Sequence, residues 1–427
     1  MRPRRQQKGL ALIIKRLVGG VAIGASALLA LTACGSGGSG SAAKTTLTMV
    51  VPDYGTGPAN TTAKYWNGII SAFEKANPSI KVTYQIYNWN DIDGKVQTML
   101  QNKQYPDLIE GESALEFAQD GIAYPASQVL SPSTDSNLLK PFRPPNSYKG
   151  TLYGIPFTTS SRTFFYNKKL FSQAGISAPP TTWAQLQADA LAIKQKTGKI
   201  GFGLPLGSEE AQAESLLWFL GNGGGYVDST GKYAINSPQN IATYNFLNSL
   251  VKSGATEPNP GSQNRTDLWQ QFAQGQIGMI NGSPALLPII ASAGKLTTAD
   301  FGDTVIPGKN GPLTSTLAVQ DPFVALSPHK HAAAIKKFLD FTYQDTYQLQ
   351  FDKEYDLLPA TQSAVNALSS DATFAPFLKL LPVGTIYPAI ANWQTVDDQI
   401  KTNIGTAIGG NPSSVLGQIQ QKATSGS

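Results

Sequence analysis

The sequence of 427 residues has a single cysteine, Cys34, and only two histidines, His329 and His331. One cysteine excludes a disulfide within the chain, so the fold depends on its hydrophobic core. The two histidines lie one residue apart, and no cysteine or acidic cluster is near them in the sequence, which falls short of a zinc-site pattern. We therefore expect no metal site, and we interpret residues 329–331 as the solvated start of a helix.

Nucleotide-binding and hydrolase motifs are also missing. The chain has no P-loop and no G-x-S-x-G nucleophile elbow. Four glycines fall between Gly221 and Gly225, but the dinucleotide fingerprint fails because Tyr226 stands where its last glycine is needed. We predict a tight turn at this point and no cofactor.

Basic charge is scarce once the N-terminus is set aside. The formal net charge is +5, but residues 1–33 hold six Lys and Arg and no Asp or Glu, so the rest of the chain carries −1. Nucleic-acid binding requires clustered Lys and Arg, and we predict no nucleic-acid partner. At roughly 100–200 residues per domain, the remaining length predicts two lobes.

The N-terminus begins with a basic stretch, and an uncharged apolar run follows from Leu17 to Ala33. This order is typical of a secretory signal peptide, which we assign to residues 1–33. The run ends in Leu31-Thr32-Ala33-Cys34, which resembles a bacterial lipobox. The resemblance implies cleavage before Cys34 and a diacylglycerol on its sulfur, which would anchor the protein to the extracytoplasmic face of the cell membrane.

Two other interpretations of this segment are a transmembrane span and a buried cysteine. The apolar run is short for a span, which needs about 20 residues. Residues 35–43 are only Gly, Ser and Ala, which is typical of a flexible linker. We therefore expect residues 34–45 to be a lipidated cysteine followed by a tether.

Apolar periodicity predicts strands that alternate with helices over the rest of the chain. The expected strands are 47–51, 80–86, 106–109, 162–166 and 201–204. The expected helices include one with Trp66, Ile69, Ile70 and Phe73 on its apolar face, one that begins after Asp91, one at 168–174 that ends at Gly175, and one at 183–196 with Thr182 as its N-cap. This alternation is typical of an α/β fold with parallel sheets between helices.

Eight segments carry a family resemblance through their order and spacing. They are 73–82, 106–107, 153–156, 165–171, 180–183, 272–282, 333–341 and 358–359. Together they resemble the carbohydrate-type solute-binding proteins of ATP-binding-cassette (ABC) importers, a group built like maltose-binding protein.

The resemblance implies an α/β, two-lobed periplasmic-binding-protein-like fold with a ligand cleft between lobes joined by crossing segments. The N-terminal lobe would comprise 46–154 plus 305–345, and the C-terminal lobe 155–304 plus 346–427. The crossings would lie near 154–156, near 305–307 and around 345–358. The implied partners are a carbohydrate ligand and the transmembrane subunits of an ABC permease, and we expect a monomer without catalytic activity.

Candidate ligand contacts in the first lobe follow its predicted strands, because ligands of open α/β lobes meet the carboxyl ends of strands. Asp53 and Tyr54 follow the first strand, and Trp89 follows the second. Glu110 and Glu112 follow the third, and we take Glu112 as a candidate contact. The alternatives are a core position for Trp89 and solvated turns for the carboxylates.

Further candidates lie beyond the first crossing. Arg162 stands beside Thr163-Phe164-Phe165 and needs a partner there, either a carboxylate of the chain or a ligand hydroxyl. Glu209, Glu210, Gln212 and Glu214 fall at a predicted helix N-terminus, where acidic residues also favour the helix dipole. The resemblance implies a ligand acceptor in this loop, and Glu209 and Gln212 are the candidates.

The last candidates are aromatic or acidic. Tyr387 and Trp393 resemble the family's late aromatic segment, which stacks on sugar, although Trp393 could instead pack under the last helices. Asp321 is a weaker candidate near the second crossing. Where the family often has an aromatic residue after Asn281-Gly282, this chain has Ser283-Pro284. One stacking platform is therefore missing, which favours a ligand smaller than a malto-oligosaccharide or posed differently.

Two other functions stay open at this point. The same fold could bind a polyamine, a glycerophosphodiester or a peptide; a phosphate site would need several Lys or Arg, whereas a polyamine site needs acids and aromatics. A cell-surface glycosidase would need two carboxylates roughly 5–9.5 Å apart. Glu112 and Glu209 could face each other across a cleft, but no acid–base pattern marks them.

Overall fold

A computed structural model describes residues 44–55, 57–89, 91–111, 113–390 and 392–425. Cys34, the expected signal peptide, most of the expected tether and Glu112 lie outside these residues. No helix in the described part of the chain combines the length and the apolar character that crossing a membrane requires.

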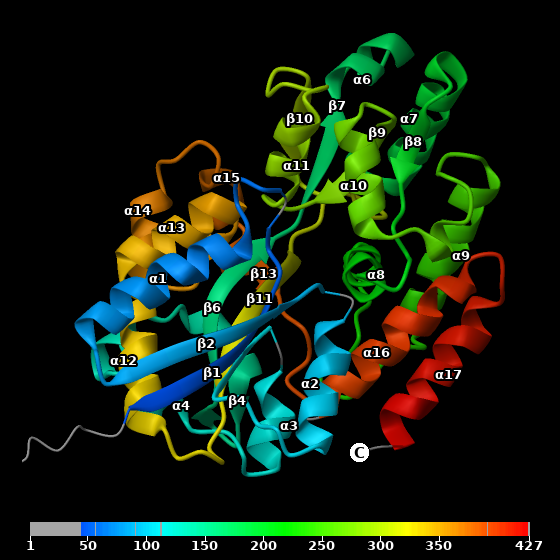
Figure 1. The fold of residues 1–427 in the computed structure, drawn as a ribbon. Helices are drawn as coiled ribbons and strands as arrows, with labels where there is room; N and C mark the ends of the chain where they lie inside the picture. Colours follow the sequence, from blue (N-terminus) through cyan, green and yellow to red (C-terminus); the bar gives the residue numbers. More distant parts are fainter. Residues whose placement is uncertain (1–43, 56, 90, 112, 391, 426–427) are drawn as a thin grey trace, which may run out of the picture. The chain divides into compact units, whose positions relative to one another are not determined.

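The first sheet contains the three early strands and four strands from later in the chain. They are β1 (Thr45–Pro52), β2 (Ile80–Tyr87), β3 (Leu108–Glu110), β6 (Gly154–Ser161), β11 (Thr316–Ala325), β12 (Leu358–Pro359) and β13 (Gly384–Thr385). Their order is β12-β6-β11-β3-β1-β2, with β13 beside β11 (Figure 1).

The expectation of purely parallel sheets is wrong. In the first sheet β1 runs parallel to β2 and β3, whereas β11 runs antiparallel to both β3 and β6. Parallel neighbours need a helical crossover, and α1 (Thr62–Ala76) and α2 (Ile92–Gln101) follow β1 and β2. Strand β11 instead returns from the other sheet and enters between β3 and β6 in the opposite direction.

The second sheet has four strands in the order β10-β7-β9-β8. They are β7 (Thr163–Asn167), β8 (Ile200–Gly203), β9 (Ile277–Gly282) and β10 (Phe301–Thr304); β7 is antiparallel to both neighbours, and β8 is parallel to β9. The strand expected at 162–166 therefore begins one residue later. Arg162 is the one residue between β6 and β7, so the chain passes there from the first sheet to the second.

The first sheet packs against helices from both ends of the chain. The apolar face expected around Trp66 is confirmed, because Trp66, Ile69, Ile70 and Phe73 are all buried in α1. Further elements that precede β6 are α3 (Ala114–Gln119), α4 (Ala126–Val129), α5 (Pro132–Asn137) and the hairpin of β4 (Ser147–Tyr148) and β5 (Thr151–Leu152). Between β11 and β13 the chain forms α12 (Ala332–Thr342), α13 (Asp345–Tyr355), α14 (Gln362–Leu368) and α15 (Ala375–Leu378).

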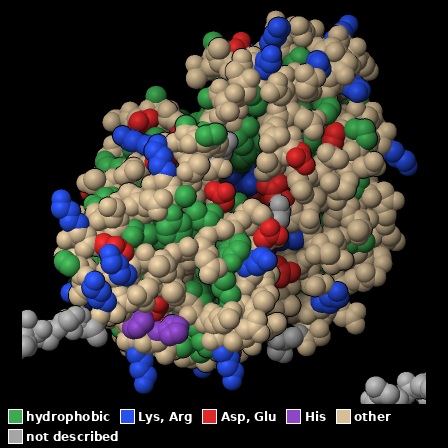
Figure 2. All heavy atoms as spheres, in the orientation of Figure 1, with side chains coloured by type: hydrophobic (Ala, Val, Ile, Leu, Met, Phe, Trp, Pro, Cys, Tyr) green, Lys and Arg blue, Asp and Glu red, His purple; other side chains and the backbone are tan. Residues whose placement is uncertain are grey.

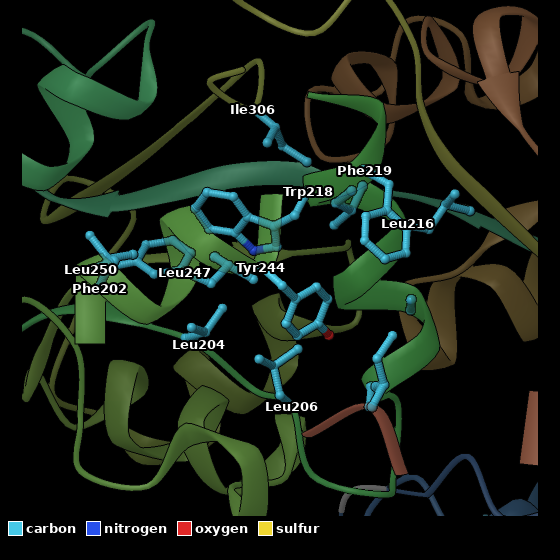
Figure 3. Packing of buried hydrophobic residues seen from close by; sticks show 14 of the residues in the cluster. Phe202, Leu204, Leu206, Leu216, Trp218, Phe219, Tyr244, Leu247, Leu250 and Ile306 are labelled. Atoms are coloured by element: carbon cyan, nitrogen blue, oxygen red, sulfur yellow. The ribbon is translucent and has the colours of Figure 1, made fainter. Parts of the chain in front are cut away.

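A second core surrounds β8 and includes the last helices. Figure 3 shows Phe202, Trp218 and Tyr244 within this core, and Trp393 and Ile400 belong to the same cluster. The helices that contribute to this core are α6 (Lys168–Ala174), α7 (Trp183–Thr197), α8 (Ala211–Leu220), α9 (Pro238–Lys252), α16 (Trp393–Asn403) and α17 (Pro412–Ser425). The helices α10 (Arg265–Ala273) and α11 (Leu286–Ala293) pack in a separate cluster with Phe165 of β7 and Ile280 of β9. Short 3₁₀ turns lie at 140–142, 144–146, 260–262, 381–383 and 404–407.

The predicted helix ends are mostly confirmed. Thr182 caps α7 in a reciprocal capping box with Gln185, and Gly175 ends α6 in the left-handed conformation that glycine adopts without strain. Asp91 occupies the N-cap position of α2 but makes no capping hydrogen bond. Its carboxylate accepts instead from Asn88 Nδ2 at 2.6 Å.

Both histidines lie just before α12 and are visible on the face in Figure 2. His331 Nδ1 lies 2.9 Å from Asp107 Oδ1, and His329 Nε2 lies 2.6 Å from the Tyr105 carbonyl oxygen. His331 is the N-cap residue of α12, so the expected helix start is confirmed. In the described part of the chain, His, Cys, Asp and Glu form no group that could hold a metal ion.

Two glycines give a matched test of this packing. A Cβ on Gly201 of β8 would lie 2.3 Å from the Ala190 carbonyl oxygen of α7, whereas a Cβ on Gly68 of α1 would meet nothing within 4 Å. We predict that Gly201→Ala lowers the free energy of unfolding by about 1–3 kcal/mol because backbone must move. Gly68→Ala should raise it by about 1 kcal/mol through helix propensity. Urea denaturation measures the free energy of unfolding of both variants. Equal changes in the two variants would contradict the close contact between β8 and α7 at Gly201.

Candidate functional site

A cavity of about 1210 Å³ is lined by residues that follow strands of both sheets and by residues of α16. Figure 2 shows acidic and basic side chains gathered around a hollow on this face. Nine of the ten predicted ligand contacts line the cavity, and the tenth, Glu112, lies outside the described residues. The nine are Asp53, Tyr54, Trp89, Arg162, Glu209, Gln212, Asp321, Tyr387 and Trp393. Contact with a ligand stays a prediction for each of them.

The loop after β1 is held in place by the first residue of α1. The Asp53 carboxylate accepts from the Thr62 hydroxyl at 2.8 Å and from the Gly55 amide at 3.1 Å. The Thr62 oxygen in turn accepts from the Tyr54 amide at 2.8 Å. These bonds fix the backbone of the loop, so that the Tyr54 ring is held at the wall of the cavity.

Trp89 is not a core residue, because 38% of its surface is exposed. Its ring meets the Tyr54 ring edge to face, with centroids 5.4 Å apart. Gly111, which has a φ of +93°, lies beside it, and a Cβ there would come within 3.5 Å of the indole. The exposed face of the indole can pack on the C–H face of a bound molecule.

Arg162 finds its partner within the chain. Its guanidinium pairs with the Glu210 carboxylate. Arg265 pairs with the other Glu210 oxygen and with Glu209 Oε1, each at 2.7 Å. Burial opposes ionisation of Glu210, but Arg162 and Arg265 lower the pKa of its carboxyl below the ordinary value. The four residues therefore form a network of two positive and two negative charges.

Glu209 is fully engaged in this network. Both of its oxygens accept from Thr266, one from the hydroxyl at 2.6 Å and the other from the amide at 3.0 Å. The Arg265 guanidinium also lies 4.7 Å from the centre of the Trp269 ring, at a distance typical of a cation–π contact. No local sequence pattern marks Arg265 or Trp269, because both are brought here by α10, a helix remote from Glu209 in the chain.

Gln212 and Glu214 lie on the first turn of α8, and both are buried. Gln212 Oε1 has no hydrogen-bond partner among the described residues. Glu214 Oε1 accepts from Trp218 Nε1 at 2.7 Å and from Asn281 Nδ2 at 2.9 Å. Burial raises the pKa of Glu214 to about 8 despite these bonds.

A second group of ion-paired side chains lies where α16 borders the cavity. It consists of Lys401, Asp397 and Asp93, and the sequence analysis did not predict it. Lys401 Nζ lies 3.0 Å from Asp397 Oδ2 in the same helix and 3.7 Å from Asp93 Oδ2 in α2. The four-residue spacing of Asp397 and Lys401 is a helix-pair signal that could have been used. Their proximity to Asp93 depends on the tertiary fold.

Trp393 both lines the cavity and packs in the core. Only 6% of its surface is exposed, and its ring stacks on Tyr387 with centroids 5.3 Å apart. A further contact at 5.3 Å joins it to Tyr226. The alternative of packing under the last helices therefore describes most of its surface, and only a small part of the ring can meet a ligand.

Tyr54 joins two carboxyl groups. Its hydroxyl oxygen lies 2.9 Å from Glu110 Oε1 and 2.8 Å from Asp321 Oδ2. Asp321 lines the cavity, whereas Glu110 is 0% exposed and lies behind Tyr54. Burial is the main cause that raises the pKa of Asp321 to about 6 and holds that of Glu110 well above its ordinary range.

The cavity is acidic and its cations are neutralised. Seven carboxylates line it, against three cations, which are Arg162, Arg265 and Lys401. Each of these three cations is ion-paired with a carboxylate of the chain. The arrangement therefore offers hydrogen-bond acceptors and aromatic faces, and it has little attraction for an anion.

Residues 68–376 match the family of bacterial extracellular solute-binding proteins. The match covers well over half of the chain. The chain belongs to this family. The predicted resemblance is therefore confirmed at the level of the family, and the solute-binding protein is extracytoplasmic by that membership.

Several curated proteins are similar to this solute-binding protein. A binding protein of Brucella abortus is 28% identical over 386 residues, which are 88% of this chain and 92% of that protein. The diacetylchitobiose-binding protein DasA of Streptomyces coelicolor is 24% identical over 428 residues, 95% and 97% of the two chains. The sn-glycerol-3-phosphate-binding protein UgpB of Brucella melitensis is 24% identical over 288 residues, 62% and 63% of the two chains.

Solved structures of two-lobed binding proteins confirm the predicted fold class. An ABC solute-binding protein of Thermotoga lettingae with bound α-D-tagatose superposes with a TM-score of 0.78 at 22% identity, covering 90% of this chain and 99% of that one. The GacH receptor of Streptomyces glaucescens, which was solved unliganded and with acarbose, gives 0.78 at 19% identity, covering 90% and 98%.

The two cavity tryptophans should differ sharply on truncation. We predict that Trp393→Ala lowers the free energy of unfolding by about 3–5 kcal/mol, the usual cost of deleting a buried large aromatic. Trp89→Ala is the matched control and should cost less than about 1 kcal/mol, because much of its ring is already in solvent. Chemical denaturation measures both, and a small loss for Trp393→Ala would show that its ring is not part of the core.

Proposed function

We propose that this protein is the lipid-anchored, sugar-binding subunit of an ABC importer and delivers a mono- or oligosaccharide to the membrane permease. The observation that carries the proposal is the chemistry of the cavity, in which carboxylates and aromatic rings surround cations that are already paired. Sugar hydroxyls donate to carboxylates, and sugar C–H faces pack on aromatic rings. The sugars bound by the similar proteins support the same class of ligand.

A glycerophosphodiester, or the sn-glycerol 3-phosphate named for the similar protein UgpB, suits this cavity less well. A phosphate group requires Arg or Lys donors that are free to pair with it. Here Arg162 and Arg265 are engaged by Glu209 and Glu210. An anionic ligand would have to displace a carboxylate from a buried pair, which is costly.

A polyamine remains the second candidate, because carboxylates outnumber cations around the cavity and Trp89 offers an exposed ring. A glycosidase is disfavoured by the geometry of Glu209, since both of its oxygens are held by Arg265 and Thr266. We therefore propose a binding protein without catalytic activity.

We further propose that ligand binding closes two lobes, one built on each sheet. The chain passes between the sheets at Arg162 and again between β10 and β11. The first passage borders the cavity at Arg162, and Val319 of β11, the strand that follows the second passage, also lines it. Hinge closure at such crossings is a general mode of ligand capture.

A ligand panel separates these functions. We expect a neutral mono- or disaccharide to raise the melting temperature, because a ligand at 100 times its Kd stabilises the folded state by about 2.7 kcal/mol. The panel should include tagatose, maltose, N,N′-diacetylchitobiose, glycerol 3-phosphate and spermidine. A shift with glycerol 3-phosphate alone would contradict the sugar proposal, and a shift with spermidine alone would favour the polyamine.

The anchor has its own test in cells. We expect Cys34→Ser to release the protein from the membrane fraction or to stall its processing, because the sulfur would carry the diacylglycerol. A Ser36→Ala variant, two residues along the tether, serves as the control and should stay with the membrane. Normal maturation and membrane fractionation of Cys34→Ser would contradict lipid anchoring.

A further inference from the structure

Three oxygen atoms from separate parts of the first sheet meet at Tyr54. The tyrosine follows β1, Glu110 ends β3, and Asp321 lies in β11. The phenol oxygen is 2.9 Å from Glu110 Oε1 and 2.8 Å from Asp321 Oδ2. Both distances are hydrogen-bond lengths for oxygen pairs.

A count of protons limits the charge that this group can carry. A phenol has one proton and can donate to only one of the two carboxyl groups. If both carboxyls were ionised, one short oxygen–oxygen contact would lack a proton and would be repulsive. One carboxyl must therefore be protonated, and it donates to the Tyr54 oxygen while Tyr54 donates to the other.

The surroundings identify Glu110 as the carboxyl that keeps its proton. Glu110 is 0% exposed, and its Oε2 atom has no hydrogen-bond partner among the described residues. The titratable groups that influence or contact it are Asp321, Tyr54, Tyr65, Tyr343 and Tyr355, and none of them is a cation. A charge on Glu110 would be buried without compensation, which is costly.

Asp321 has the opposite surroundings. It lines the cavity, and the charged groups that act on it include Arg162 and Arg265 as well as Glu210 and Tyr54. Two nearby cations and the Tyr54 donor favour its ionised form. The direction of the pKa shifts agrees with this assignment, since burial raises the pKa of Glu110 well above its ordinary range and that of Asp321 only to about 6.

We propose that Glu110 is a positioning residue that keeps its proton at neutral pH, donates it to Tyr54, and so directs the Tyr54 hydroxyl to Asp321, which faces the ligand as a carboxylate. The statement about the ligand rests on the proposed function, whereas the place of the proton does not. Tyr54, Glu110 and Asp321 together then carry one negative charge, which lies on Asp321 at the wall of the cavity. A ligand that places a hydrogen-bond donor against the Asp321 carboxylate is therefore favoured.

Binding should consequently depend on pH. Asp321 accepts from the ligand only when it is ionised, so affinity should be full above about pH 6 and should fall as the pH drops through that value. One proton per site limits the fall to about tenfold per pH unit. Asp321 is therefore the member of the Tyr54–Glu110–Asp321 group whose ionisation controls the affinity.

Infrared difference spectroscopy tests the place of the proton without any ligand. Glu214 is also protonated at neutral pH and contributes its own carbonyl stretch, so the spectrum of each variant is subtracted from that of the wild type. The difference between wild type and Glu110→Gln should contain the carbonyl stretch of a protonated carboxyl, and the difference between wild type and Asp321→Asn should lack it. The reverse pattern, or the absence of the band from the first difference, would overturn the proposal. Asp321→Asn alone still decides the question if Glu110→Gln fails to fold.

Calorimetric titration with N,N′-diacetylchitobiose between about pH 5 and pH 8 tests the consequence for binding. The pH dependence of Kd should persist in Glu110→Gln, whose amide also donates to Tyr54, and it should vanish in Asp321→Asn. Loss of the pH dependence in Glu110→Gln would contradict the positioning role. If this sugar does not bind while the infrared result holds, the sugar proposal fails and the proton assignment stands.

Discussion

Charge compensation within the cavity is the constraint on which the site depends. Arg162, the residue that joins the two sheets, is held by Glu210, and Arg265 links Glu210 to Glu209. Because the ends of this network come from the β6–β7 junction, the loop before α8 and the start of α10, it ties together three parts of the chain that are distant in sequence. It fixes the wall of the cavity and neutralises two of the three cations that line it.

Charge compensation also explains why the carboxylates around the cavity differ in what they can bind. Glu209 and Glu210 are paired with arginines, and Glu214 is buried, where it accepts hydrogen bonds from Trp218 and Asn281. Asp321 differs because, among the described residues, its one side-chain hydrogen bond is with Tyr54, and its other oxygen makes no such bond there. Side chains that can meet a neutral ligand therefore include Asp321 in β11, the exposed ring of Trp89 and the buried amide of Gln212.

Local features of this fold could be predicted from the sequence, since they depend on neighbours along the chain. The apolar face of α1, the cap at Thr182 and the end of α6 at Gly175 follow from spacing and from the chemistry of single residues. The candidate contacts also line one cavity, because positions after strands converge at the same edge of a sheet.

Other features depend on contacts between distant residues, which no local pattern records. The antiparallel entry of β11 follows from the passage of the chain through the second sheet. The partner of Arg162 is 48 positions away, and the link of Tyr54 to Asp321 spans 267 positions. The burial of Glu110 behind Tyr54 likewise depends on distant contacts, so sequence alone does not mark Glu110 as part of the site.

A crystal structure of the protein with a bound sugar tests the central claim most directly. The account predicts that the sugar lies in the cavity with a hydroxyl on Asp321 and a C–H face on Trp89, and that the pairs of Arg162 and Arg265 with Glu210 remain intact. A ligand that displaces Glu210 from either arginine, or that occupies a different surface, would contradict it.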